Sequence, residues 1–366
     1  MPKQFLKFGG KYSLFQNTLL RCSDPFFDPR PIIVTQVEQR FLIASNVNKL
    51  GQGADIVLEP QRRNSCAAVV TGALRALQRD PNAVVLVMAA DHHIPDFLAF
   101  RRAVAEARTD AETGYIVTFG ITPNHPATGY GYIKPGLLLS QNRSAEVDRF
   151  VEKPDCDTAF TYIQEGYFWN SGNFLSLAAT LIEEAEKFAP EIVASARLSL
   201  ERSTMDDGFL WLEETAYAAV TSNSFDYAIM EKTNRAAVYR VDHEWSDIGS
   251  WGTVWELMEK DRPVGSSRLV FDGMGNVVLE DALDGFVVML TPITIEAGAS
   301  HGHRLPSDTA TSWTVLHGEV EIESAGKIQS IKANETAHVP FGVGCRISNN
   351  ATYPAQVLQV QARHFA

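Results

Sequence analysis

Two aspartates are candidate ligands for a divalent cation. Asp91 directly follows the apolar run 83–90, which has the composition of a buried strand, and Asp247 lies between two tryptophans just before Gly249. Open α/β sheets bind ligands at the carboxyl ends of their strands, and Mg²⁺ prefers one or two carboxylates plus phosphate oxygens. Either aspartate would serve equally well as a helix N-cap. The pair therefore indicates a metal site only if the fold brings the two together.

An acid–base pair ends another strand-like run, at Glu152 and Lys153. A lysine there can meet a phosphate as a point charge, and a carboxylate can accept hydrogen bonds from sugar hydroxyls. Gly131, between two tyrosines, and Asn170, beside Trp169, could let a ligand approach the backbone and bind its hydroxyls. A solvated strand end and ordinary turn chemistry explain the same residues.

The segment 59–65 reads EPQRRNS and indicates a turn that leads into a helix capped by Asn64 or Ser65. Its paired arginines, Arg62 and Arg63, could serve a triphosphate near the helix N-terminus or simply project into water.

The elements that must position these residues alternate between short strands and helices. That alternation predicts an α/β fold with a doubly wound, mostly parallel sheet covered by helices on both faces. The helical patterns lie at 11–21, 65–77 and 178–200, and the strand patterns at 31–35, 55–58, 83–88, 115–120 and 146–152. From Leu269 onward the helical patterns give way to short strand-like runs, typical of a small all-β sandwich or barrel.

Length and charge restrict the class of protein. With 366 residues we expect two domains, at 1–265 and 286–366, joined by a linker at 266–285. The net charge of −12, from 44 acidic and 32 basic residues, argues against a nucleic-acid binder, which needs a basic surface. No apolar run is long enough to cross a membrane, and the four cysteines lie far apart, so we expect a cytoplasmic protein without a disulfide framework.

The order and spacing of eight motifs resemble the mannose-1-phosphate guanylyltransferase family, in its long bacterial form with a cupin-like, isomerase-type domain at the C-terminus. In chain order the motifs are PKQFL from Pro2, EPQRRNS from Glu59, LVMAADHHI from Leu86, TFGITPNHPATGYGYI from Thr118, FVEKPD from Phe150, YFWNSGNF from Tyr167, SFDYAIMEKT from Ser224 and WSDIGSW from Trp245.

The resemblance implies a nucleotide-diphospho-sugar transferase fold and the reaction of GTP with mannose 1-phosphate to give GDP-mannose and pyrophosphate, with Mg²⁺ as cofactor. The implied roles are metal binding by Asp91 and Asp247, phosphate binding by Lys3 and Lys153, sugar binding by Gly131, Glu152 and Asn170, and nucleotide-side contacts by Glu59, Arg63 and Asn64.

Several positions depart from the family pattern. The strand and glycine-rich loop of the form GGSGTRxxPLSR, which come before PKQF in the family, have no counterpart in these 366 residues. Such a loop supplies N–H donors to a triphosphate, so we expect a loss of several kcal/mol, at ~3 kcal/mol per donor. We also expect two rows of unpaired backbone groups in the centre of the sheet. Ala127 stands where an acid is usual, and NSCAA replaces NTAPA after Arg63.

The C-terminal region retains only part of the family's isomerase site. His301 and His303 remain, while Thr311 and Cys345 occupy the positions of the acid and of the last histidine. We therefore expect a structural or oligomerising domain, with a homodimer as the candidate assembly.

Two alternatives to the guanylyltransferase remain open. One is a non-catalytic homologue that binds a sugar nucleotide or a partner enzyme. The other is an active isomerase domain, since two imidazoles and a thiolate can bind zinc.

Overall fold

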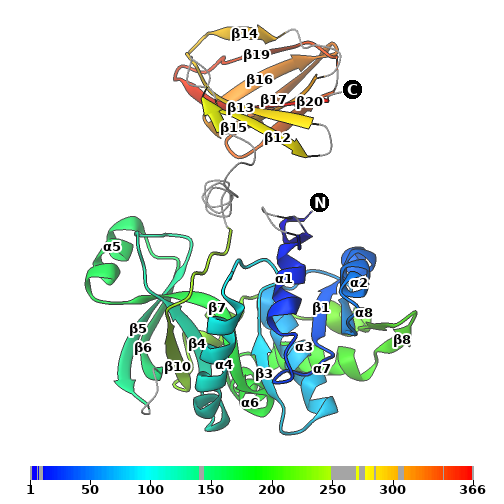
Figure 1. Ribbon diagram of the computed structural model, residues 1–366, viewed down its shortest axis with the longest axis vertical. Coiled ribbons are helices and arrows are strands. Elements are labelled where there is room, and N and C mark those ends of the chain that lie inside the picture. The colour runs from blue at the N-terminus through cyan, green and yellow to red at the C-terminus, as the bar shows by residue number, and fades with distance from the viewer. Residues whose placement is uncertain are drawn as a thin grey trace. The chain divides into compact units, whose positions relative to one another are not determined.

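The computed structural model describes residues 2–5, 7, 11–139, 144–248, 269–271, 277–283, 286–303, 309–340 and 342–364. Contacts divide the chain into two compact units, Met1–Asp261 and Arg262–Ala366, drawn in Figure 1. The first unit has helices and strands, whereas the described part of the second contains strands alone. None of the described helices is both long enough and apolar enough to span a bilayer.

The first unit begins with a four-stranded sheet. Its order is β1 (Ile32–Gln36), β2 (Asp55–Glu59), β9 (Phe209–Trp211) and β8 (Thr204–Asp206). The first three strands are parallel, and β8 forms an antiparallel hairpin with β9. One face packs on α1 (Leu14–Arg21) and α2 (Arg40–Lys49), and the other on α3 (Asn64–Arg79). Helices thus cover both faces, as expected for an α/β fold.

A six-stranded sheet carries most of the candidate site. Its order is β3 (Val84–Val87), β7 (Phe168–Leu177), β4 (Ile116–Ile121), β10 (Ala236–Val241), β6 (Ser144–Glu152) and β5 (Gly131–Leu138). Of these pairs only β4 and β10 are parallel. The expected α/β layering is confirmed, but the pairing is more mixed than expected, because β7 runs back between β3 and β4 instead of crossing over through a helix.

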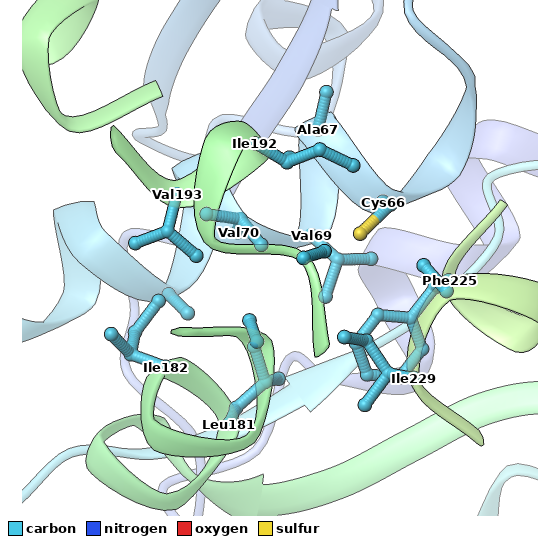
Figure 2. Close-up of a cluster of buried hydrophobic side chains, with 14 of the residues drawn as sticks. Cys66, Ala67, Val69, Val70, Leu181, Ile182, Ile192, Val193, Phe225 and Ile229 are labelled. Atoms are coloured by element: carbon cyan, nitrogen blue, oxygen red, sulfur yellow. The ribbon is translucent and has the colours of Figure 1, made fainter. Parts of the chain in front are cut away.

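Alternate residues of the six-stranded sheet face two separate cores. Ile116 and Val238 belong to the cluster under α3, α6 (Ala178–Phe188) and α7 (Pro190–Glu201), whereas Val117 and Ala237 belong to the cluster under α4 (Phe97–Glu112). This alternation follows from the two-residue repeat of a strand. Figure 2 shows part of the first cluster, in which side chains of α3, α6 and α7 pack together with Phe225 and Ile229.

Strand β1 is an edge strand of the four-stranded sheet, and β3 is an edge strand of the six-stranded sheet. Neither strand has a second partner among the described residues. Both strands pack on the same apolar cluster under α3. All four residues of β3 are only partly buried, whereas every residue of β2 and of β4 is buried. Within the described part of the chain, β1 and β3 thus each leave one edge unpaired, as expected from the sequence, but these edges belong to two sheets and are mostly only partly buried.

The long helix expected over 178–200 is two helices, α6 (Ala178–Phe188) and α7 (Pro190–Glu201). Pro190 has no N–H to donate and occupies the first turn of α7, where none is needed, so the chain bends there. Helix α1 is close to its expected range because Ser13 and Gln16 form a capping box at its start.

The second unit consists of two sheets, as expected for a small all-β domain. The larger sheet has the order β11 (Leu269–Phe271), β12 (Val277–Leu283), β13 (Phe286–Ile295), β20 (Ala355–His364), β15 (Thr309–His317) and β18 (Thr336–Val339). The smaller sheet has the order β14 (Ser300–His303), β19 (Cys345–Ser348), β16 (Glu319–Ser324) and β17 (Lys327–Lys332). The expected linker at 266–285 is wrong in part, because β11 and β12 lie within it and belong to the larger sheet of the second unit. Strand β11 pairs antiparallel with β12, and β12 pairs antiparallel with β13.

Candidate functional site

The fold brings together the two segments that carry the candidate metal ligands. His93 and Ser246 form an antiparallel bridge with backbone N–O distances of 2.8 and 3.0 Å. Beside it, the indole Nε1 of Trp245 donates to Nδ1 of His92 at 3.3 Å. Asp91 and Asp247, both partly buried, therefore lie on adjoining segments although they are far apart in sequence. The fold thus brings the two segments together, and a cation shared by the two carboxylates stays a prediction.

The helix-cap alternative is wrong for Asp91. Helix α4 begins at Phe97, and its N-cap is Asp96, whose side chain accepts from the backbone N–H of Ala99 at 2.8 Å. Asp91 lies five residues earlier and outside the helix. For Asp247 the helix-cap alternative stays untested, because residues 249–268 lie outside the described part of the chain.

Tyr130 connects Asp247 to the rest of the site. Its hydroxyl donates to Oδ1 of Asp247 at 2.9 Å, and its ring makes edge contacts with Trp169 and Trp245 at centroid distances of 5.0 and 5.2 Å. Burial, and then the neighbouring carboxylate, raise the pKa of Tyr130 above its ordinary value. The hydroxyl therefore stays protonated and can keep donating to Asp247.

The donors at this position suit Mg²⁺. Two carboxylates on adjoining segments are hard oxygen ligands, and Mg²⁺ usually takes one or two of these and completes its shell with water and phosphate oxygens. Among the described residues, no group of three or more His, Cys, Asp or Glu side chains surrounds a common point. The donor types are those that a cation shared with a phosphate ligand would use.

The acid–base pair lies at the end of β6. Nζ of Lys153 is 3.2 Å from Oε1 of Glu152, and the lysine side chain is 57% exposed while the glutamate is 11% exposed. Lys153 has φ of 49°, a conformation that costs a non-glycine residue about 1 kcal/mol or more. Strained residues of this kind concentrate at ligand sites. The geometry gives a fixed acid and a lysine that can reach a phosphate.

Gly131 makes room for Glu152. A Cβ on Gly131 would lie 2.5 Å from Oε2 of Glu152 and 3.3 Å from Cβ of Asn170. No larger residue fits there unless one of those side chains moves. Gly131, Glu152 and Asn170, three residues expected to bind a sugar, are therefore in direct contact, on β5, β6 and β7.

The orientation of the Asn170 amide is set by its neighbours. Its Oδ1 accepts from the hydroxyl of Thr118 at 2.8 Å and from the N–H of Gly172 at 3.1 Å. Its Nδ2 donates to Oδ1 of Asp226 at 2.8 Å. An asparagine amide held on both sides in this way cannot flip without losing hydrogen bonds.

Asp226 is a site residue that the sequence analysis did not assign. It begins the short π-helix η3 (Asp226–Met230), a rare element that often marks functional positions. Its only sequence signal was its place in the SFDYAIMEKT motif, to which no role was attached. Burial raises the pKa of Asp226, and burial followed by the charge of Asp226 raises the pKa of Glu152.

On the nucleotide side, Glu59 and Arg63 are engaged within the protein. The hydroxyl of Tyr217 donates to Oε1 of Glu59, which is buried at the end of β2, and burial raises the pKa of Glu59. Nη2 of Arg63 donates to Oε1 of Gln61 at 3.0 Å and to the carbonyl of Ala218. In this conformation both side chains are engaged in hydrogen bonds within the protein.

Asn64 lies at the start of α3, not before it. Arg63 is the N-cap, without a side-chain capping bond, and Asn64 has φ of 64° while its Oδ1 accepts from the N–H of Ser65 at 2.8 Å. The hydroxyl of Ser65 accepts from the N–H of Phe225 at 2.9 Å. This bond connects the start of α3 directly to the segment that carries Asp226.

The side chain of Lys3 lies outside the described residues, so its expected role stays a prediction. Its backbone begins the short helix η1 (Lys3–Phe5), which Phe5 anchors by a ring contact of 5.7 Å with Phe15. The N-terminal segment is thus attached to α1.

In the second unit, Cys345 is a core residue. It is buried in the apolar cluster with Trp313, and burial raises the pKa of its thiol, which opposes the thiolate that zinc binding requires. Strand register pairs it with His303, whose side chain lies outside the described residues, and His301 is exposed. Nothing in this arrangement favours the isomerase alternative.

The layered α/β fold, with candidate ligand-binding residues at strand ends, is the architecture of an enzyme that binds a phosphorylated ligand beside its sheet. The profile of the family described as Nucleotidyl transferase matches residues 1–263, and the chain belongs to this family.

Relatives narrow the class further. A mannose-1-phosphate guanylyltransferase of Salmonella montevideo is 42% identical over 99% of this chain and 91% of its own length. The xanthan biosynthesis protein XanB of Xanthomonas campestris is 32% identical with the same coverage. A crystal structure described as a mannose-1-phosphate geranyltransferase from Thermus thermophilus superposes with a TM-score of 0.61 at 31% identity, over 70% of this chain and 72% of that one. The family resemblance inferred from the motifs is confirmed.

Proposed function

We propose that the chain transfers a guanylyl group from GTP to mannose 1-phosphate, giving GDP-mannose and pyrophosphate for polysaccharide synthesis. An oxygen of the sugar phosphate attacks the α-phosphorus, and the bond from the α-phosphorus to the bridging oxygen breaks as pyrophosphate leaves. Such a reaction needs little covalent help from the protein. Positioning and charge neutralisation provide most of the rate.

One observation carries the proposal: Tyr130 joins the two halves of the site. Its hydroxyl holds Asp247 at 2.9 Å, and its carbonyl accepts the N–H of Lys153 at 3.2 Å. The candidate metal ligand and the candidate phosphate ligand are thus attached to one residue. Two ligands held by one residue keep a fixed separation, which would help to position the reacting groups.

The chain's own residues have the following parts in this proposal. Glu152 and Asn170 hold hydroxyls of the sugar, and the exposed ammonium of Lys153 turns to the phosphate of that sugar. Asp91 and Asp247 would hold Mg²⁺, which when bound neutralises phosphate charge. Support comes from the donor types and from the 42% identical Salmonella guanylyltransferase.

The test is pyrophosphate release from the purified chain with GTP, Mg²⁺ and mannose 1-phosphate, run beside ATP, CTP and UTP. We expect release that requires all three components and is fastest with GTP. Binding of GDP-mannose without any release would support the non-catalytic alternative. A chain that neither binds GDP-mannose nor releases pyrophosphate would overturn both the guanylyltransferase and the sugar-nucleotide-binding alternative.

A variant pair refines the test. Replacing Asp247 by Asn keeps the shape and removes one charge, so we expect at least about a hundredfold loss of rate. Asp207→Asn serves as the matched control, because Asp207 is exposed in the β8–β9 hairpin at φ of 48°, which Asn tolerates. Equal rates for the two variants would contradict the role of Asp247.

A further inference from the structure

Asp226 lies behind the proposed sugar subsite, and two hydrogen bonds connect its segment to that subsite. It accepts from Nδ2 of Asn170 at 2.8 Å. The next residues of the same segment contain Glu231, whose Oε1 accepts from the backbone N–H of Glu152 at 3.1 Å. One short segment after β9 thus contacts both of the residues proposed to bind sugar hydroxyls.

The segment is rigid enough to act as a support. Phe225 and Ile229, on either side of Asp226, are fully buried in the cluster that also holds Cys66 and Val69 (Figure 2). Phe225 further stacks edge-on against Phe174 of β7 at 5.0 Å. Its backbone N–H is held by Ser65 at the start of α3. Asp226 is therefore fixed relative to β7, the strand that carries Asn170.

The charges in this subsite are unbalanced. Asp226, Glu152 and Glu231 act on one another, and Lys153 is the cation that faces them. The buried thiol of Cys66 also faces Asp226, with a pKa raised to about 12 mainly by burial. Among the described charges that act on Glu152 and Asp226, the acids outnumber the single lysine, which favours a ligand that brings hydroxyl protons and opposes one that brings a further negative charge.

We propose that Asp226 is a positioning and specificity residue, which orients the Asn170 amide and supplies negative charge behind Glu152, so that the subsite accepts a neutral, hydroxyl-bearing ring and rejects a ring with a carboxylate. This inference rests on the proposed function, because it takes Glu152 and Asn170 as sugar ligands. Because Lys153 is proposed to bind the phosphate of the sugar, the subsite would reject only sugars that carry a further anionic group on the ring.

Two substitutions separate the two roles. Asp226→Asn keeps an oxygen that can accept from Asn170 and removes the charge. Asp226→Ala removes both. Asp207→Asn again serves as the control, because it removes one exposed charge from the same unit.

The experiment measures the dissociation constants of mannose 1-phosphate and mannuronic acid 1-phosphate by calorimetry, with Mg²⁺ and a non-hydrolysable GTP analogue present, over a range of pH. We expect the wild-type chain and the control to prefer mannose 1-phosphate. In Asp226→Asn the ratio of the two dissociation constants, mannuronic acid 1-phosphate over mannose 1-phosphate, should fall about tenfold, which is the order expected for one partly buried charge. Asp226→Ala should in addition weaken mannose 1-phosphate itself by about tenfold.

The pH dependence of mannose 1-phosphate affinity gives a second test, because a purely structural role of Asp226 would leave it unchanged. Glu152 accepts from hydroxyls as a carboxylate, so affinity is full above its pKa and falls as the pH drops through it. Loss of the Asp226 charge lowers the pKa of Glu152, so the acid limb of the profile should move to lower pH in Asp226→Asn.

An Asp226→Asn variant with unchanged preference and an unchanged acid limb would overturn the inference and leave the guanylyltransferase intact. A wild-type chain that neither binds mannose 1-phosphate nor releases pyrophosphate would overturn the proposed function, and the inference would fall with it.

Discussion

The hydroxyl of Tyr130 donates to Oδ1 of Asp247 at 2.9 Å across the centre of the candidate site. The same residue lies immediately before Gly131, and its carbonyl is bonded to the backbone of Lys153. Loss of one oxygen atom from Tyr130 would therefore remove this hydrogen bond to Asp247 without disturbing the backbone contact.

We expect Tyr130→Phe to weaken binding of Mg²⁺, or of Mn²⁺ as its spectroscopic substitute, by about tenfold or more, because loss of a hydrogen bond that orients a metal ligand costs about that much in affinity. Manganese binding followed by electron paramagnetic resonance measures the effect without relying on turnover. Tyr353→Phe, an exposed tyrosine of the second unit, is the control. Equal cation affinities for the two variants would refute the orienting role.

Gly131→Ala should damage the sugar side of the site. The new Cβ would lie 2.5 Å from Oε2 of Glu152, so the carboxylate must move, and we expect a loss of about 1–3 kcal/mol in the free energy of unfolding together with at least about tenfold weaker mannose 1-phosphate binding. Gly129→Ala is the matched control, since its Cβ would meet no atom within 4 Å. Denaturant unfolding and calorimetry measure the two effects. Similar behaviour of both variants would show that the close approach at Gly131 is unimportant.

Lys153 combines a functional side chain with a strained backbone. Both Lys153→Gly and Lys153→Ala remove the ammonium, so we expect each to weaken mannose 1-phosphate binding by at least about tenfold. Only glycine relieves the positive φ of 49°, so the glycine variant should be the more stable of the two by about 1 kcal/mol. Thermal unfolding of the pair checks this order. A more stable alanine variant would indicate that the backbone is not strained there.

Hydrogen exchange should show the interruption between the two sheets of the first unit. Strands β2 and β4 are paired on both sides and fully buried, whereas β1 and β3 are paired on one side and largely only partly buried. Amides on the unpaired edges have no described acceptor, so we expect them to exchange at least about a hundredfold faster than those of β2 and β4. Equal protection in all four strands would mean that these edges are covered.

Local sequence accounts for most of the elements but not for their partners. The capping box at Ser13 and the apolar repeat start and maintain α1, and Pro190 divides the helix expected over 178–200, because a proline cannot donate within a helix. The mixed pairing of the six-stranded sheet was not foreseen. It depends on β7 running back between β3 and β4, and no residue within β7 encodes which neighbours it meets.

By itself, the sequence determined the family, the α/β and all-β division, and the residue types at the site, because motif spacing and strand or helix periodicity are local properties of the chain. Only the tertiary structure decided that the segments of Asp91 and Asp247 adjoin, that Glu59 is buried against Tyr217, and that Asp226 supports Asn170. These relationships join residues far apart along the chain. They exist because packing of the sheets and helices, rather than local propensity, brings strand ends and loops to the same place.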